Sequence, residues 1–293
     1  MVSRLTVDSG GHVTGVSTID DTGNPRQFKA SVVTLSGGAV ETARLLFNSP
    51  TPQETNGIGN NNDQLGQHLQ GHYYPGGIGL FEKELHDGFG PGAAVATCQF
   101  NHANEGIVGG GMLADDDILL PIIFWKNSLP PDIPKWGHAN KEFMRDNYRR
   151  VSDIRGPMQE IPSPDGRITV DAHVRDRYGI PVVHLSGTTH PETLRTARFM
   201  GERAKEWLHA SGAVKVWGDE PRLKLSGGQH QAGTCRMGDD PQSSVVDRWS
   251  KVHGHDNLFI ADGSVHVTNG GFNPVLTIMA LAWRATENIV KTW

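Results

Sequence analysis

Near its amino terminus the chain carries a local pattern that sharply limits the folds open to it. A hairpin of two alternating runs, Val2–Val7 and Val13–Ile19, is followed by Ser31–Leu35, a mostly apolar run that is typical of a buried strand. Ser36-Gly37-Gly38 forms a turn, and Ala39–Phe47 then repeats apolar residues with helical spacing. Strand, glycine turn and helix in this order direct a helix N-terminus toward an anionic group. The pattern predicts an α/β unit.

The carboxy-terminal region holds a second strand that ends in a polar turn. Asn257–Ala261 is a short apolar run followed by Asp262-Gly263-Ser264, and α/β folds place ligands where strands end in this way. A glycine-rich turn at Asn269–Phe272 leads to Asn273-Pro274. Asn before Pro predicts the N-cap of a final helix that runs to about Val290.

The region between these ends has the character of an antiparallel sheet. Thr189 and Glu192 predict a capping box around Pro191 for one long helix that runs to about Ala210, with Gly212 just past its end. Short β-like runs, separated by turn residues, occur at Gly76–Phe81, Ala93–Phe100, Met158–Ile161, Arg167–Val170 and Ile180–Leu185.

Composition excludes several function classes. The net charge is −5 and the basic residues are scattered, so we expect no nucleic-acid partner. Two cysteines, Cys98 and Cys235, cannot build a disulfide framework or a four-cysteine zinc site, and no metal is expected. No apolar run reaches the roughly 18 residues of a membrane span. No secretory signal is visible, which leaves the compartment, cytoplasm or periplasm, open.

One glycine cluster imitates a dinucleotide-binding loop. Gly88–Ala93 matches the loose form of that fingerprint, but a charged stretch precedes it and a strand-like run follows. The fingerprint needs a strand before it and a helix after it, so we interpret the cluster as a plain turn. The sequence contains no P-loop, HExxH motif or GxSxG elbow.

Three linked motifs carry the strongest signal. They are HQAGTCRMG at His230–Gly238, NLFIADGS at Asn257–Ser264 and NPVLT at Asn273–Thr277. In this order and spacing they resemble the carboxy-terminal signature of the glucose–methanol–choline (GMC) oxidoreductases. Val33–Asn48 and Asp63–His72 resemble the same family near the front, so the resemblance spans nearly the whole chain. The middle is similar, more loosely, to the sugar- and gluconate-dehydrogenase branch.

The resemblance implies a fold and a cofactor. The fold is α/β (α+β), with a discontinuous FAD-binding lobe at 1–64 and 226–293 and an antiparallel-sheet substrate lobe with helices at 65–225. The FAD-binding lobe lacks the first βαβ unit with its GxGxxG turn, which either makes the chain a fragment or leaves that unit to a separate polypeptide. The residues expected at the FAD are Val2, Gly38, Ala39, Asp262, Gly263, Gly271, Asn273 and Pro274.

By the same resemblance His230 and Asn273 form the catalytic pair. Oxidising an alcohol needs a base for the hydroxyl proton while hydride leaves carbon, and a neutral histidine suits that task. An asparagine amide can donate to an oxygen that gains negative charge. The alternatives are a surface histidine and a simple N-cap. A helix that begins at Asn273-Pro274 would also favour an anionic reduced flavin.

Several other residues have both a functional and a structural interpretation. Gly270 and Gly271 permit either close approach of a ring system or a plain turn. Cys235 is expected to be buried and inert, and His72 is expected to be a packed core histidine rather than a substrate-side residue. For Gln159, Glu160 and Arg167 we favour a solvated hairpin over contacts with sugar hydroxyls.

The predicted function is therefore flavin-dependent oxidation of a sugar or another small-molecule alcohol, with hydride passing to FAD. Two alternatives stay open: a subunit that works only with a separate FAD-binding chain, and a non-catalytic fragment. The sequence does not identify the substrate, the carbon oxidised or the electron acceptor.

Overall fold

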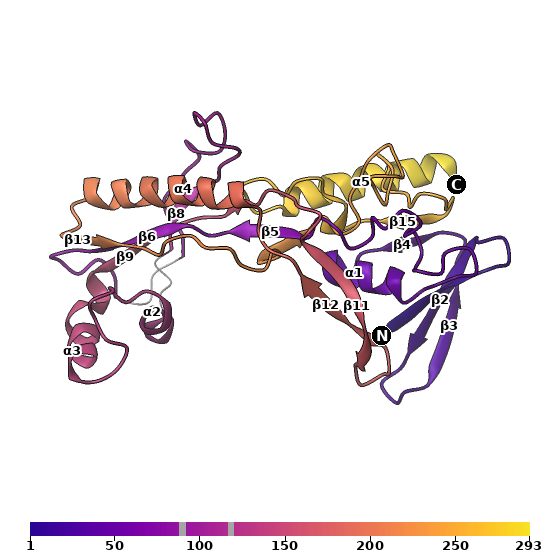
Figure 1. Cartoon of the computed structure of the whole chain (residues 1–293), viewed down its shortest axis with the longest axis horizontal. Helices are drawn as coiled ribbons and strands as arrows, with labels where there is room; N and C mark the ends of the chain where they lie inside the picture. Colours follow the sequence, from indigo (N-terminus) through magenta and orange to yellow (C-terminus); the bar gives the residue numbers. More distant parts are fainter. Residues whose placement is uncertain (88–91, 117–119) are drawn as a thin grey trace.

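The computed structural model describes residues 1–87, 92–116 and 120–293. The molecule is elongated, with a sheet and α4 at one end and both chain termini toward the other (Figure 1). The turn predicted at Gly88–Ala93 falls largely outside the described residues.

The terminal end is built from the first and last parts of the chain. β1 (Val2–Val7), β2 (Val13–Ile19) and β3 (Pro25–Lys29) form an antiparallel meander, which confirms the predicted hairpin. β4 (Val33–Leu35) pairs in parallel with β15 (Leu258–Ile260). Parallel strands need a long connection between them, and here almost the whole chain lies between the two strands. The pair thus joins the two predicted α/β segments.

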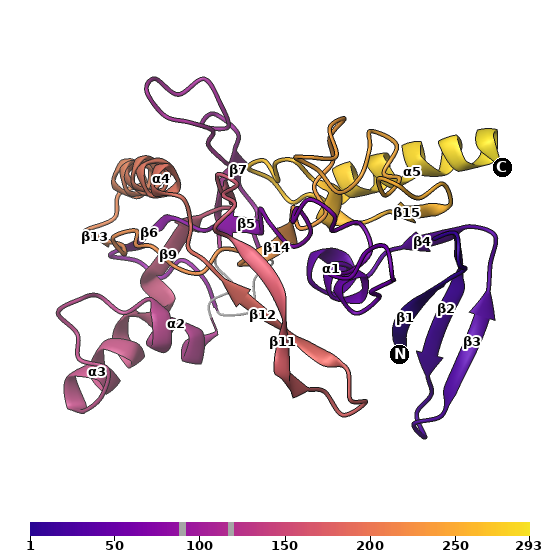
Figure 2. The ribbon, with the colours of Figure 1, turned by 45° about the vertical axis from the view of Figure 1, so that its right-hand side comes forward.

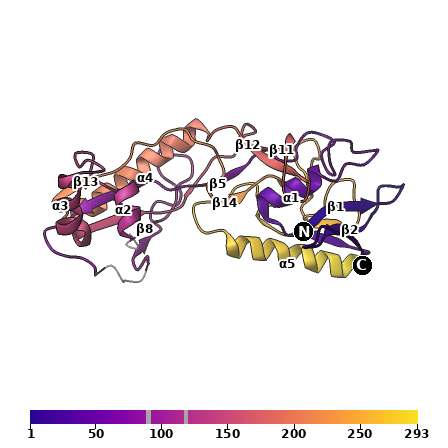
Figure 3. The same ribbon diagram turned by 90° about the horizontal axis from the view of Figure 1, so that it is seen from below.

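One apolar core holds this end together. α1 (Gly38–Phe47) packs beside the β4–β15 pair, and η2 (Gly263–Val265) follows β15. The core residues are apolar and nearly all inaccessible; they include Leu5, Val13, Leu46, Ile58, Cys235 and Ile260. α5 (Val275–Thr292) runs along the outside (Figure 3) and buries only Ala285 among its residues.

The opposite end is a five-stranded antiparallel sheet. Its order is β13 (Lys215–Trp217), β6 (Gly76–Leu80), β9 (Val151–Arg155), β8 (Leu113–Asp115) and β7 (Ala96–Thr97). α4 (Pro191–Ala210) covers one face, while α2 (Pro121–Asn127), α3 (His138–Asn147) and η1 (Tyr148–Arg150) lie on the other side (Figures 1 and 2).

A small sheet and a hairpin connect the two ends. β5 (Gln70–Tyr73) lies between β10 (Met158–Gln159) and β14 (Gln229–Ala232). β11 (Arg167–Arg175) and β12 (Pro181–Ser186) form the hairpin, which projects beside α1 (Figure 2). The order of elements therefore brings two distant segments, β10 and β14, together on β5.

Three local predictions were wrong. The cap of α4 is His190, whose side chain accepts from the backbone N–H of Glu192, while Thr189 is buried against Lys224. α5 begins at Val275 with Pro274 as its N-cap, so Asn273 lies one residue outside the cap position. The strand predicted at Ala93–Phe100 shrinks to β7, because most of the segment stays exposed and only Phe100 at its end packs against a core.

The predicted fold class is confirmed: antiparallel sheets with helices stand beside an α/β portion that has a single parallel strand pair in the described residues. The domain boundaries at 64/65 and 225/226 stay a prediction. Within the described ranges, no helix combines the length and the apolar character that crossing a membrane requires.

Candidate active site

Two adjacent strands carry the candidate catalytic histidines. β14 pairs with β5 so that Gln229 lies opposite His72, and this register brings the rings of His72 and His230 to a centroid distance of 5.0 Å. The strands approach closely at Gly71, where a Cβ atom would lie 2.7 Å from the backbone nitrogen of Gly228. A larger residue at this position would push the two histidines apart.

A chain of hydrogen bonds fixes the proton on each ring. His72 Nε2 lies 3.0 Å from the carbonyl oxygen of Gly270, and His72 Nδ1 lies 2.9 Å from His230 Nδ1. A carbonyl oxygen only accepts, so His72 Nε2 donates to it. In a neutral ring the other nitrogen then accepts, and His230 Nδ1 donates to His72. The Nε2 atom of His230 is left with its lone pair, which is what a general base requires.

Burial keeps His72 in the neutral state that this arrangement needs. Only 1% of its surface is exposed, and burial, followed by the charge of His230, lowers the pKa of His72 below its ordinary value. The expectation of a packed core histidine was thus right about burial. It missed the contact with His230, for which the sequence offers no signal except the position of His72 in a segment resembling the family.

The backbone at His230 is held in an uncommon conformation. His230 has φ 59°, which costs a non-glycine residue on the order of 1 kcal/mol or more. The Asn269 side chain donates to the carbonyl oxygen of His230 at 2.6 Å, and the Asn269 backbone N–H donates to Gln70 Oε1 at 2.9 Å. Buried Asn269 thereby ties His230 to β5.

A buried carboxylate also braces the strand pair. Glu160 is 1% exposed and its Oε2 accepts from the backbone N–H of Gly71 at 2.8 Å. Burial raises the pKa of this carboxyl above its ordinary value. The solvated hairpin favoured for this segment was therefore wrong at Glu160. Gln159 donates to Thr268, and Arg167 pairs with Asp63 away from the histidines.

Asn273 and His72 line one cavity of about 630 Å³. Tyr74, Met112, Asp116, Arg155, Lys224 and Gln229 also line it. Asn273 is exposed, and its side chain makes no hydrogen bond to the described residues. α5 begins two residues later, so the open backbone N–H groups of its first turn lie close to this cavity.

Four of the residues expected at the cofactor gather at the carboxyl end of the parallel strands. Asp262 accepts from the backbone N–H of Gly38 at 3.0 Å and from the Thr42 hydroxyl at 2.6 Å. Gly263 follows Asp262, and the carbonyl oxygen of Ala39 accepts from Thr234. The N-terminus of α1 is thus directed toward an anionic group, as expected, and this group is the protein's own Asp262 carboxylate.

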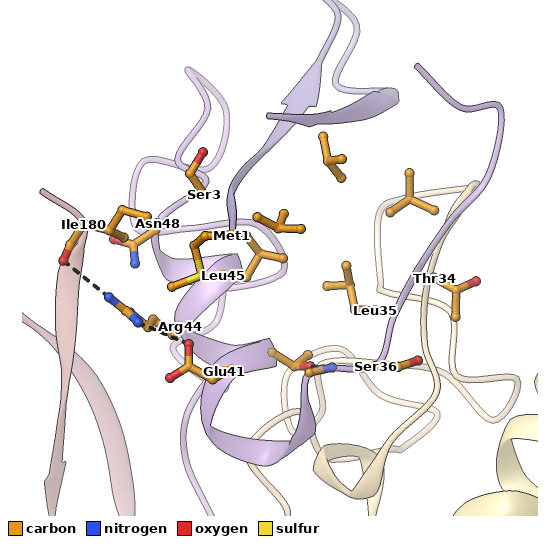
Figure 4. A pocket seen from close by; sticks show the side chains of 15 residues that line it. Met1, Ser3, Thr34, Leu35, Ser36, Glu41, Arg44, Leu45, Asn48 and Ile180 are labelled. Atoms are coloured by element: carbon orange, nitrogen blue, oxygen red, sulfur yellow. Dashed lines mark hydrogen bonds and ion pairs between the residues drawn. The ribbon is translucent and has the colours of Figure 1, made fainter. Parts of the chain in front are cut away.

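Val2 stands apart from that group. It lines a cavity of about 320 Å³ together with Thr34, Leu35, Ser36 and Gly37. Figure 4 shows this cavity between the start of the chain, the end of β4 and α1, where Arg44 donates to the carbonyl oxygen of Ile180. The cavity therefore lies along β4 on the side of β1.

The glycine turn before α5 contacts His72 on one side and the loop around Met112 on the other. Gly270 supplies the carbonyl that accepts from His72. Gly271 accepts from the Met112 N–H, and a Cβ atom at Gly271 would lie 2.6 Å from Gly110 O. Close approach is thus the reason for glycine here, and the approaching group on that side is backbone. Pro274 is buried and caps α5.

The predicted burial of Cys235 is confirmed. The thiol is fully inaccessible, and burial raises its pKa far above the ordinary value. No group of three or more metal-ligating side chains occurs among the described residues.

Comparison with known proteins places this geometry among oxidoreductases. Residues 162–282 match the family model described as GMC oxidoreductase. The chain is 31% identical to 6'''-hydroxyparomomycin C oxidase of Streptomyces lividus, over 98% of this chain and 50% of that protein. It is 24% identical to the fructose dehydrogenase large subunit of Gluconobacter japonicus, over 99% of this chain and 53% of that protein.

Solved structures share the fold. Pyridoxine 4-oxidase from Mesorbium loti superposes with a TM-score of 0.67 at 15% identity, covering 100% of this chain and 57% of that one. Formate oxidase of Aspergillus oryzae gives 0.67 at 18% identity, covering 98% and 59%. The chain spans about half the length of the curated relatives it matches.

Proposed function

The chain belongs to the GMC oxidoreductases, and on that basis we propose that it forms the carboxy-terminal part of an FAD-dependent enzyme that oxidises the CH–OH group of a sugar or another alcohol. The observation that carries the proposal is the hydrogen-bonded series Gly270 O, His72, His230. It leaves His230 Nε2 free to take a proton, which a plain structural histidine would not need.

The roles of the two catalytic residues follow from their chemistry. His230 accepts the hydroxyl proton on Nε2 while its Nδ1 proton stays bonded to His72. The Asn273 amide donates to the same substrate oxygen as negative charge builds on it. FAD, when bound, supplies the acceptor for the hydride that leaves the carbon. Proton and hydride together account for both hydrogens lost in converting CH–OH to C=O.

The residues of this chain fit the flavin ring of FAD better than its diphosphate. Asn273 and the open N–H groups at the start of α5 suit the ring that gains negative charge on reduction. The diphosphate needs a separate cradle of backbone N–H groups, and in α1 that position is taken by Asp262. We therefore assign Asn273, Pro274 and Gly271 to the ring side, and Gly38, Ala39, Asp262, Gly263 and Val2 to the boundary with the absent GxGxxG unit.

Two surfaces fit a further polypeptide segment that completes the FAD lobe. β4 uses one edge for β15 and has no ladder partner on its other edge among the described residues. α5 exposes Leu276 by 81%, Trp283 by 71% and Val290 by 76%. Exposed apolar residues in such a row mark an interaction site. The partner favoured here is a segment that carries the absent GxGxxG unit, in the same polypeptide or in another one. The hydrogen-bonded pair of His72 and His230 supports a catalytic role over a non-catalytic one.

The test is reconstitution. The chain is produced together with the polypeptide encoded directly upstream of Met1, and the complex is purified and examined for a flavin spectrum. Anaerobic addition of sugars and short alcohols should bleach the flavin, and His230→Ala should prevent rapid bleaching at equal flavin content. A flavin-loaded complex that no alcohol or sugar reduces would contradict the proposed function.

A further inference from the structure

A second cavity adjoins the one that holds His72 and Asn273. It measures about 760 Å³, and the two cavities share Tyr74, Arg155 and Lys224 in their linings. Each is large enough for a group the size of a sugar. A substrate with its reacting carbon beside His72 can therefore extend past these three side chains into the second cavity.

The second cavity is basic although the chain as a whole is acidic. The chain carries a net charge of −5, whereas this lining contains five basic side chains and two acidic ones. The basic residues are Lys126, Lys135, Arg155, Arg222 and Lys224, and the acidic ones are Asp219 and Glu220.

Some of these charges are already paired. Arg155 donates to Asp153 with Nε at 2.8 Å and lies near Asp116. Glu220 pairs with Arg198 outside the cavity, and Lys135 donates to a backbone carbonyl. The remaining basic side chains, Lys126, Arg222 and Lys224, form no ion pair with the residues that the structure describes.

Lys224 is held at the boundary between the two cavities. Its ammonium nitrogen lies 3.8 Å from the centroid of the Tyr73 ring, and such contacts fix a cation over an aromatic face. The Tyr73 hydroxyl accepts from the backbone N–H of Arg222 at 3.1 Å and donates to Arg222 O at 3.2 Å. Tyr73 on β5 therefore holds the Lys224 ammonium and the Arg222 backbone beside His72, its neighbour on the same strand. Burial also lowers the pKa of Lys224, and a bound anion would offset that effect.

We propose that the second cavity binds an anionic group, a carboxylate or a phosphate, carried by the alcohol substrate whose CH–OH group lies beside His72. Lys224 and Arg222 contact the anion, with Lys126 across the cavity. The inference rests on the proposed function for the location of the reacting carbon, and it narrows the substrate class from sugars in general to sugar acids or sugar phosphates. Lys224 already lies over the Tyr73 ring and near the charge of Glu160, but a neutral sugar would give none of the three cations an ion-pair partner.

The test is equilibrium binding to the full chain without flavin, because both cavities lie within this chain. Saturation-transfer NMR and calorimetry compare gluconate, glucose 6-phosphate and glucose at low ionic strength. The variants are Lys224→Gln, Arg222→Gln and, as a matched control at the far end of the molecule, Lys29→Gln. Circular dichroism confirms that each variant is folded.

We expect at least one anion to bind about tenfold or more tightly than glucose, and each cavity variant to remove most of that difference while Lys29→Gln keeps it. Added salt should weaken anion binding but not glucose binding. Preference for gluconate identifies a carboxylate, and preference for glucose 6-phosphate identifies a phosphate. Equal binding of all three, or binding unchanged in both cavity variants, overturns the proposal. Because no turnover is measured, failure of alcohol oxidation would leave this result intact.

Discussion

His72 Nδ1 lies 2.9 Å from His230 Nδ1, although 158 positions separate the two residues in the sequence. Neither side chain alone defines which nitrogen of His230 is free. The carbonyl oxygen of Gly270 sets the tautomer of His72, and His72 sets that of His230. A residue buried on a neighbouring strand therefore prepares the proposed base for its reaction.

Replacing His72 tests this relationship in the reconstituted enzyme. His72→Ala should slow flavin reduction by at least about tenfold, since a base in the wrong tautomer or orientation loses much of its effect. His72→Asn should retain more activity, because its amide oxygen can accept from His230 near the position of Nδ1. Stopped-flow reduction across pH measures both. Equal rates and equal pH profiles for His72→Ala and the wild type would show that His72 is only a packing residue.

Removing the proposed base should have a larger effect. We expect His230→Ala to slow flavin reduction by about 10²–10⁴-fold, the usual contribution of a positioned base, and to change the pH dependence of the rate. The comparison is made at matched flavin content under anaerobic conditions. Wild-type rates with an unchanged pH profile would show that another group takes the proton.

Asn273 should contribute as an oxyanion donor. Asn273→Ala should slow reduction by about 10²-fold, and Asn273→Asp should be slower still because a carboxylate repels a developing alkoxide. The helix content should not change, since Asn273 lies outside the N-cap position of α5 and its side chain makes no capping bond. Far-ultraviolet circular dichroism provides that control, and an Asp variant faster than the Ala variant would contradict the assigned role.

The chain purified alone should be colourless. Asp262 already accepts from the N–H group at the start of α1, so the N-terminus of α1 does not provide the cradle that the FAD diphosphate needs. Absorbance near the visible flavin bands should appear only when a GxGxxG-bearing segment is supplied, either fused to the chain or added as a separate polypeptide. Stoichiometric FAD in the isolated chain would mean that the cofactor is held by residues described here.

Acid should weaken the fold through His68. Burial, followed by the charge of Arg236, lowers the pKa of His68 from 6.5 to about 4. Between these two pH values the unfolded chain binds more protons than the folded one. The contribution of His68 to the free energy of unfolding is therefore fully present above pH 6.5 and is lost as the pH falls toward 4. In His68→Gln the urea midpoint should decline less over this window. A wild-type slope in the variant would assign the acid sensitivity to other groups.

The strands and the helix near the two chain termini could be predicted, because each segment has a clear apolar pattern and its apolar side chains are buried in the fold. Val33–Leu35, Gly38–Phe47 and Leu258–Ile260 all form the elements expected of them. The cap of α4 was not predictable in the same way. Both the His190 ring nitrogen and the Thr189 hydroxyl could accept from the first N–H groups of α4. His190 is the cap, because Thr189 is held by a backbone hydrogen bond to Lys224. That bond joins residues far apart in sequence.

In the candidate site, too, the residues in contiguous motifs were predictable, and those defined by contacts between distant segments were not. His230 and Asn273 were predicted from motifs that are contiguous in sequence, and the structure keeps Asn273 beside the cavity of His72. The role of His72, the buried brace at Glu160 and the occupation of α1 by Asp262 depend on pairing between segments 89 to 224 positions apart. Local sequence patterns do not predict such contacts. The first two form only after β5 has paired with β10 and β14, and the contact of Asp262 with α1 forms only after β4 has paired with β15.

The parallel pairing of β4 with β15 has a consequence for biosynthesis. β4 ends at Leu35, but its ladder partner begins at Leu258. During translation β4 must therefore wait for its ladder partner until residues 258–260 have left the ribosome. Closing such a long loop is slow, and an open strand edge invites pairing with other chains. A nascent chain of this protein should thus depend on chaperones for longer than its length alone would suggest.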